Sequence, residues 1–144
     1  KIKKRKLEHR IQLQLADSEQ LPFQDNSFDA ITVGFGVRNF ENIEKGLKEI
    51  YRVLKSKGTL VILEPSIPKK SPFRQVYKLY FNHLLPKIGK FISQDKEAYS
   101  YLPESVAAFP SNKRFVNKLN KIGFKESKCI PLSLGIVSLF IAIK

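Results

Sequence analysis

Acidic, basic and glycine residues follow the predicted strands of this sequence, at positions where parallel strands would bind a ligand. Asp17 comes after the first predicted strand, the segment 34–39 (GFGVRN) after the second, and Glu64 after the third. Open parallel α/β sheets bind ligands in the crevice at the carboxyl ends of their strands. A carboxylate fixed there accepts hydrogen bonds from a hydroxyl or an exocyclic amine. Asp17 equally fits a loop residue or a helix cap.

Other kinds of catalytic site are not indicated. The sequence has no zinc-ligand spacing, no Cys–His pair and no nucleophile-elbow motif, which argues against several classes of hydrolase. His9 lies in a basic segment and His83 on a predicted helix, so each is expected to be a surface or packing residue. No metal site is predicted.

Four segments in the first half predict the elements that position the strand-end residues. The range 11–15 alternates apolar and polar residues, as a half-exposed strand does. The ranges 30–35 and 59–63 are nearly continuous apolar runs, which is typical of strands buried on both faces. Between them, 41–55 carries one apolar helical stripe, with acids early and bases late. Two strands joined by such a helix are expected to be parallel.

The second half continues this alternation of helices and strands, which predicts an α/β layer architecture. A basic helix rich in aromatic residues begins near residue 73, and two further helices are predicted over 94–101 and 112–122. The ranges 123–130 and 136–143 are typical of strands. The short loop PLSLG separates them, which permits antiparallel pairing.

Positive charge is concentrated in two segments of a chain of 144 residues with a formal net charge of +13. Residues 1–10 carry six basic side chains and one acidic, and are expected to be solvated. Residues 66–93 carry six basic side chains and no acidic one, interleaved with aromatic residues. That second segment either buries an apolar stripe against the sheet or contacts an anionic membrane surface. Nucleic acid is not expected, because no recognition motif accompanies the charge.

The remaining composition fits one soluble domain. No apolar run reaches the roughly 18 residues that a membrane-spanning helix needs. The single Cys129 cannot form an internal disulfide, which favours a reducing, cytoplasmic location. Because the chain contains no Met, it is expected to be a piece of a longer protein.

Several longer motifs resemble one enzyme family. The segments are GFGVRN, YRVLKSKG, LVILEPSIP, YSYLPES and the closing GIVSLFIAIK. They are similar to the class I S-adenosylmethionine-dependent methyltransferases that methylate the quinone ring in menaquinone and ubiquinone biosynthesis. The resemblance runs from about residue 11 to residue 144. The pair FGVRN and YSYLPES is more selective than the LPF and RVLK elements, which resemble those of many methyltransferases.

The resemblance implies a site for S-adenosylmethionine. Asp17 and the backbone of Ser18 would bracket the adenine, although most relatives have Ala in place of Ser18. Gly34 and Phe35 would lie along the methionine part of the cofactor, where glycine permits a close approach.

The resemblance also implies a site for the methyl acceptor. Arg38 and Asn39 would face a prenylated quinol, where a cation stabilises an ionised ring oxygen or orders a water that removes its proton. Tyr77, Tyr99 and Tyr101 would line a cover over the ring. Arg38 equally fits a structural ion pair with a nearby acid, and each tyrosine fits core packing.

Parts of the family pattern are absent from this sequence. It lacks the glycine-rich loop after the first strand and the acidic residue that holds the ribose hydroxyls. We therefore expect one partial domain over 1–144, the C-terminal part of a Rossmann-like seven-stranded sheet, with a basic segment over 1–10 and a helical cover over 66–110. The missing first two strands would lie between the strands at 11–15 and 30–35. Open sheet edges are expected, and the chain alone should bind the cofactor poorly.

The predicted function is C-methylation of a prenylated quinol, such as demethylmenaquinol, by a cytoplasmic enzyme at the inner face of the membrane. The acceptor is either a naphthoquinol or a benzoquinol. Two alternatives stay open: a methyltransferase for another small molecule, and a non-catalytic basic module that binds lipid or nucleic acid.

Overall fold

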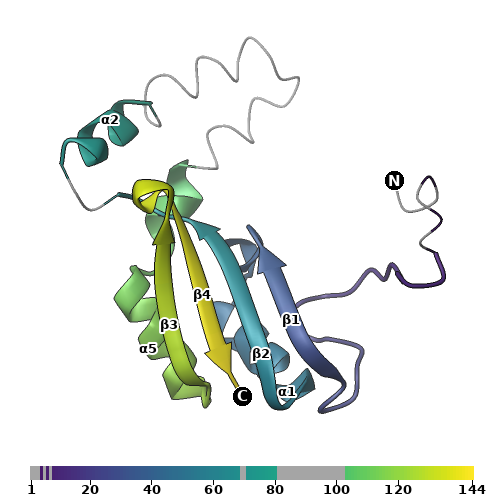
Figure 1. Ribbon diagram of the computed structural model, residues 1–144. Helices are drawn as coiled ribbons and strands as arrows, with labels where there is room; N and C mark the ends of the chain where they lie inside the picture. The colour runs from purple at the N-terminus through teal and green to yellow at the C-terminus, as the bar shows by residue number, and fades with distance from the viewer. Residues whose placement is uncertain (1–3, 5, 7, 69–70, 81–102) are drawn as a thin grey trace.

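The strands of this computed structural model form one mixed sheet with the order β1-β2-β4-β3 (Figure 1). The structure describes residues 4, 6, 8–68, 71–80 and 103–144. Strands β1 and β2 are parallel, whereas β4 is antiparallel to both of its neighbours, β2 and β3. The strand bounds are β1 Phe28–Gly34, β2 Leu54–Pro65, β3 Lys125–Leu132 and β4 Val137–Ile143.

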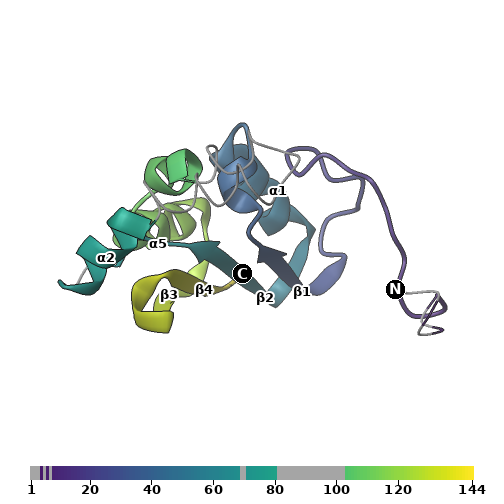
Figure 2. The ribbon, with the colours of Figure 1, turned by 90° about the horizontal axis from the view of Figure 1, so that it is seen from above.

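Two helices pack on the same face of this sheet (Figure 2). Helix α1 spans Ile43–Val53, and the side chain of its N-cap Asn42 accepts a hydrogen bond from the Lys45 amide at 3.1 Å. Helix α5 spans Asn112–Ile122 and ends at Gly123, whose φ of 125° suits a residue without a side chain. In the described part of the chain, no helix covers the opposite face of the sheet.

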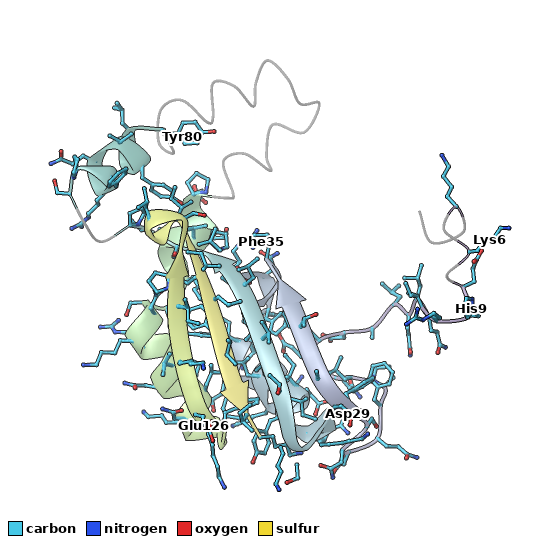
Figure 3. The ribbon with its side chains drawn as sticks, viewed as in Figure 1. Lys6, His9, Asp29, Phe35, Tyr80 and Glu126 are labelled. Atoms are coloured by element: carbon cyan, nitrogen blue, oxygen red, sulfur yellow. The ribbon has the colours of Figure 1, made fainter. Side chains whose placement is uncertain are left out.

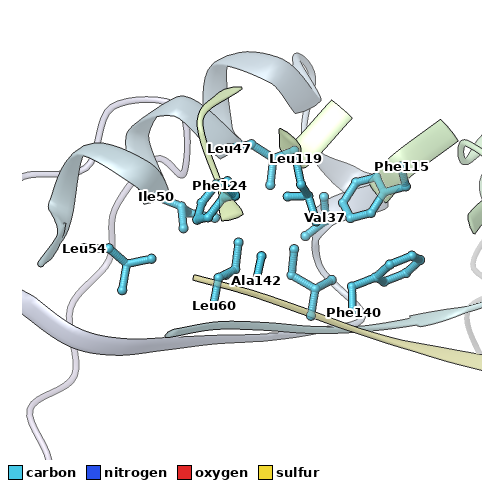
Figure 4. Packing of buried hydrophobic residues seen from close by; sticks show 11 residues of the cluster. Val37, Leu47, Ile50, Leu54, Leu60, Phe115, Leu119, Phe124, Phe140 and Ala142 are labelled. Carbon is cyan, nitrogen blue, oxygen red and sulfur yellow. The ribbon is translucent and has the colours of Figure 1, made fainter. Parts of the chain in front are cut away.

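The core lies between the sheet and these two helices (Figure 4). Apolar residues at helical spacing on α1 and α5 meet alternate residues of β2 and β4, because side chains of a strand point to opposite faces in turn. The Phe115 and Phe140 rings meet edge to face, with centroids 4.7 Å apart. The buried cluster comprises Val37, Leu47, Ile50, Leu54, Leu60, Ile62, Phe115, Leu119, Phe124, Phe140 and Ala142.

Most predicted elements after residue 35 are confirmed. The helices expected over 41–55 and 112–122 are α1 and α5, and the strand expected over 59–63 is the centre of β2. The two last strands pair antiparallel as predicted, joined by the short 3-10 helix η4, Ser133–Gly135. Helix α2 spans Phe73–Leu79, within the predicted basic aromatic helix. The helix predicted over 94–101 lies outside the described residues.

The prediction that the strand at 30–35 is buried on both faces is wrong. Ala30 and Thr32 of β1 are exposed, whereas Ile31 and Val33 are half-buried against the helices. The outer edge of β1 pairs with no strand in the part of the chain that the structure describes, so one face and one edge stay open. This open edge agrees with the expectation from the sequence.

The prediction of a strand over 11–15 is also wrong. These residues have no strand pairing, and the side chains of Leu13 and Leu15 are 80% and 101% exposed. A strand needs a neighbour to accept and donate its backbone hydrogen bonds. None of the described residues forms such a neighbour here, so the alternating pattern alone does not produce a strand.

Gly46 of α1 allows the helix to approach the ring of Phe40. An added Cβ would lie 2.4 Å from a ring carbon of Phe40. We expect Gly46→Ala to destabilise the fold by about 1–3 kcal/mol through overpacking, although alanine is the better helix former. Urea denaturation measures this change. The double variant Gly46→Ala, Phe40→Leu should recover part of the loss. A more stable Gly46→Ala single variant would contradict the packing.

Candidate functional site

The carboxyl end of β1 has an unusual backbone. Gly34 ends the strand, and no atom lies within 4 Å of the position that a Cβ would take there, so packing does not require the glycine. Phe35 follows with a left-handed φ of 56° and a side chain that is 46% exposed (Figure 3). A bulky residue rarely adopts this conformation, and such strain gathers at functional sites. The open space and the strained backbone both mark a place where a ligand can approach the chain.

The buried carboxylate of Glu64 holds the turn that comes next. The 3-10 helix η2 spans Val37–Asn39, and Glu64 is the penultimate residue of β2, with 0% exposure. The Val37 amide donates to Glu64 Oε1 at 2.7 Å, and Arg38 Nη1 lies 3.1 Å from Glu64 Oε2. A buried carboxylate is tolerated only when it is paired and hydrogen-bonded, and here both conditions are met.

Strand alternation explains why an acidic residue is buried at this place. Leu60, Ile62 and Glu64 occupy alternate positions of β2, and all three point to the face covered by helices. At the end of the strand this face lies beside η2. The same period that builds the core therefore directs a carboxylate at the backbone of the turn.

Arg38 forms a structural ion pair with a nearby acid, which is the alternative role that the sequence suggested for it. Its side chain is 12% exposed, and Nη1 also donates to the Phe35 carbonyl oxygen. Its Nε is buried and has no hydrogen-bond partner among the described residues. Asn39 is exposed, and its backbone amide donates to the Gly36 carbonyl at 3.0 Å. Glu64 thus brings the guanidinium to the end of β1, beside Phe35.

Asp17 and Ser18 lie in a separate turn beside the start of α1. Asp17 Oδ1 accepts a hydrogen bond from the Glu19 amide at 2.8 Å, which is the loop role considered for this residue. The Glu19 carboxylate accepts in turn from the Asn42 amide at the N-cap of α1. Asp17 is exposed, and only one of its carboxylate oxygens, Oδ1, accepts a hydrogen bond from the described residues.

Arg52, near the end of α1, holds the loop that joins this turn to β1. Its Nη2 donates to the Leu21 carbonyl at 3.0 Å, and its Nη1 donates to the Phe23 carbonyl and to Asp25 Oδ1, both at 2.8 Å. The Glu49 carboxylate completes the arrangement: it pairs with Arg52 at 2.8 Å and accepts from the Leu21 amide at 2.9 Å. The hydrogen bond from Arg52 is the main reason that the pKa of Glu49 is lowered.

Tyr77 is the one predicted substrate-binding tyrosine within the described residues, since Tyr99 and Tyr101 lie outside them. It is 8% exposed and lies with Pro68, Val76 and Tyr80 around a small hollow under α2. Burial raises the pKa of its hydroxyl to about 12, so the phenol is neutral at physiological pH. Tyr77 therefore suits apolar contact better than proton removal.

Sequence reasoning placed Glu64 at a strand end facing the ligand crevice but did not name it as the buried partner of Arg38, and it assigned no role to Glu49 or Arg52. Glu64 could have been placed on the core face from its two-residue alternation with Leu60 and Ile62. The Glu49 and Arg52 spacing of three residues predicts a pair on one helix face, but not their contacts with a distant loop. Among the described residues, no group of acidic, histidine or cysteine side chains is arranged to hold a metal ion.

Removing the Glu64 carboxylate should destabilise the site strongly. We expect Glu64→Ala to lower the free energy of unfolding by about 3–5 kcal/mol, because it leaves Arg38 and the Val37 amide buried without a partner. Urea denaturation measures this loss. The double variant Glu64→Leu, Arg38→Met should recover much of it. Glu44→Ala, which removes an exposed acid of α1, is the control. A Glu64→Ala variant as stable as this control would contradict the structure.

Removing Arg52 should have a pH-dependent effect. We expect Arg52→Ala to lower the midpoint of urea denaturation at neutral pH through lost hydrogen bonds, and to lower it by far more than the exposed Lys48→Ala does. The lowered pKa of Glu49 means that its ion pair stabilises the fold above the ordinary value of 4.5. This part is lost as the pH falls through the lowered pKa. The Arg52→Ala deficit should therefore shrink at about pH 3, and an equal deficit at both pH values would contradict the pairing.

Comparison with known proteins shows the family of this chain. Residues 1–144 match the model of the ubiE/COQ5 methyltransferase family. A demethylmenaquinone methyltransferase of Porphyromonas gingivalis is 44% identical over all of this chain, which covers 59% of that protein. A ubiquinone/menaquinone biosynthesis C-methyltransferase of Rickettsia bellii is 48% identical over 130 residues, 90% of this chain and 52% of that protein. The chain thus spans a little over half the length of these relatives.

The fold is also similar to solved structures. A SAM-dependent methyltransferase from Aquifex aeolicus matches 99% of this chain with a TM-score of 0.65 and 15% sequence identity, and 58% of that chain is covered. At this identity the likeness concerns the fold alone, an α/β methyltransferase-like arrangement with parallel and antiparallel strand pairs. The family match covers the whole chain, and this chain belongs to the ubiE/COQ5 methyltransferase family.

Proposed function

We propose that this chain forms the C-terminal part of an S-adenosylmethionine-dependent enzyme that methylates a carbon of a prenylated quinol ring. The observation that carries the proposal is the strand end itself. There Gly34 leaves open space, Phe35 is in the left-handed conformation, and Arg38 is fixed beside them by buried Glu64. The family match and the names of the relatives support the same class of reaction.

Part of the cofactor site would lie on the described residues. We propose that Asp17 and Ser18 contact the adenine, since Asp17 Oδ2 accepts no hydrogen bond from the described residues. Gly34 and Phe35 would border the methionine part, because the space beside Gly34 admits a ligand. When bound, S-adenosylmethionine supplies an electrophilic methyl group. The Arg52 and Glu49 contacts would keep the adenine side and the acceptor side of the site at a fixed spacing.

Arg38 and Asn39 would act on the acceptor. Attack by a ring carbon requires an electron-rich ring, which is achieved when a ring hydroxyl loses its proton. A guanidinium held near that oxygen stabilises the anion, and its fixed geometry avoids reorganisation during the reaction. The Arg38 side chain keeps 12% exposure, so an acceptor can approach part of the guanidinium from solvent. Tyr77, Tyr99 and Tyr101 would line the apolar cover formed by residues 66–110.

An acceptor that is a membrane lipid implies that the enzyme meets its substrate at a membrane surface. No helix in the described ranges is long and apolar enough to span a membrane. We propose instead peripheral contact on the cytoplasmic side, with the basic residues of 66–93 near anionic lipid. The basic segment 1–10 would stay solvated.

The 144 residues by themselves should bind S-adenosylmethionine weakly. Their sequence has no glycine-rich turn between a strand and a helix, which is the usual backbone cradle for this type of cofactor in α/β folds. Isothermal titration calorimetry with S-adenosylmethionine tests this expectation. We expect no saturable heat in the micromolar range, and a micromolar dissociation constant would contradict the proposal that the cofactor site is incomplete.

A chimera tests the proposed reaction. The chain is fused behind the N-terminal segment of the Porphyromonas gingivalis relative that the alignment leaves unmatched, and methyl transfer is assayed with demethylmenaquinol, a demethylated benzoquinol and soluble phenols. We expect transfer to one of the two quinols, and Arg38→Gln should lower kcat by about 100-fold. The exposed Arg114→Gln on α5 is the control. A folded chimera that methylates only soluble phenols, or an Arg38→Gln variant with the kcat of the unaltered chimera, would contradict the proposal.

A further inference from the structure

The turn between β3 and β4 exposes a leucine in a strained backbone. Ser133, Leu134 and Gly135 have φ values of 47°, 60° and 91°, all in the left-handed region. The Leu134 side chain is 68% exposed. Leucine is disfavoured in this conformation, where glycine or asparagine is the usual choice, and its side chain gains little from packing here. Folding alone therefore gives no reason for a leucine at this tip.

A chain of hydrogen bonds fixes this turn to the end of β2. The Ser66 hydroxyl donates to the Gly135 carbonyl at 2.8 Å, and the Ser66 amide donates to the Ile136 carbonyl at 2.8 Å. Ser138 Oγ donates to Ser66 Oγ at 2.9 Å and accepts from Asn112 Nδ2 at 2.8 Å. The turn is thus anchored on one side, and Leu134 is held outward.

The exposed leucine belongs to a larger apolar surface, which we name the end surface. It lies at the carboxyl end of β2, the end of the sheet that also carries Phe35, and α2 forms one side of it (Figures 1 and 3). Phe73 and Leu134 both border two adjoining hollows, of roughly 650 and 210 Å³. The exposed apolar members of the end surface, each of which borders one or both hollows, are Ile67, Phe73, Val76, Leu134 and Ile136.

The charges around the end surface are basic. Lys113 and Lys128 border the larger hollow, and Arg74 is exposed on α2. Neither hollow is bordered by a carboxylate among the described residues. An apolar surface with cations at its margin is complementary to an anionic bilayer, whose acyl region takes the apolar side chains while its phosphates meet the cations.

We propose that the end surface docks on anionic membranes, with Leu134 inserted among the acyl chains and with Arg74, Lys113 and Lys128 against lipid phosphates. The inference rests on the proposed function in that a lipid-borne acceptor gives the docking a purpose. It goes further in placing the main insertion residue on the β3–β4 turn, far along the chain from the basic segment 66–93. The bilayer would then lie at the same end of the sheet as Phe35 and Arg38.

Single tryptophans test the insertion directly, because the chain contains no Trp. Leu134→Trp places a fluorophore at the tip, and Ser56→Trp places one at the exposed opposite end of β2 as the matched control. Both are mixed with vesicles of equal parts phosphatidylglycerol and phosphatidylcholine. We expect a blue shift and quenching by brominated acyl chains for Leu134→Trp alone. Sedimentation of both variants with the vesicles but no quenching of Leu134→Trp would overturn the insertion.

Leu134→Asn separates docking from folding. Asparagine tolerates the left-handed conformation, so the midpoint of urea denaturation should be unchanged or higher, while partition to the same vesicles should fall about tenfold. Lys113→Gln with Lys128→Gln should reduce the dependence on phosphatidylglycerol. The proposal is overturned if the unaltered chain fails to bind these vesicles. It is also overturned if the chain forms a dimer in solution that Leu134→Asn dissociates, because the end surface would then be a dimer interface. Vesicle binding requires no methyl transfer, so an active chimera without docking would remove this inference alone.

Discussion

Glu64 is a carboxylate without solvent exposure whose two oxygens accept from the Val37 amide and from the Arg38 guanidinium. These contacts join the end of β2 to the turn after β1, two strands that are neighbours in the sheet. An ion pair of this kind adds little net stability, because the desolvation of both charges offsets their attraction. The ion pair instead fixes the position of the Arg38 guanidinium and the conformation of the η2 turn.

The site is therefore assembled by elements that also form the core. Leu60 and Ile62 bury the face of β2 that directs Glu64 at η2. On the other side of α1, Arg52 and Glu49 bind the loop before β1 through its backbone. One helix thus has an apolar side that packs on the sheet and a polar side that holds a loop. The adenine side and the acceptor side of the proposed site are spaced by this single rigid element.

Local periodicity accounts for the elements that the sequence predicted well. Helices α1 and α5 have apolar residues at helical spacing, and the short loop before β4 imposes antiparallel pairing. The range 11–15 and the burial of β1 were mispredicted because both depend on neighbours that the pattern does not reveal. The left-handed conformation of Phe35 and the carbonyl groups that Arg52 binds depend on tertiary contacts, which cannot be predicted from residue types.

Amide hydrogen exchange of Val37, followed by NMR, tests the central claim most directly. If the Glu64 carboxylate holds η2, the Val37 amide is a buried donor to a charged acceptor, and it should exchange as slowly as the Ile62 amide in the centre of β2. Exchange of the Val37 amide at the rate of an unstructured peptide, with Ile62 still protected, would contradict the claim that Glu64 fixes the turn and with it Arg38.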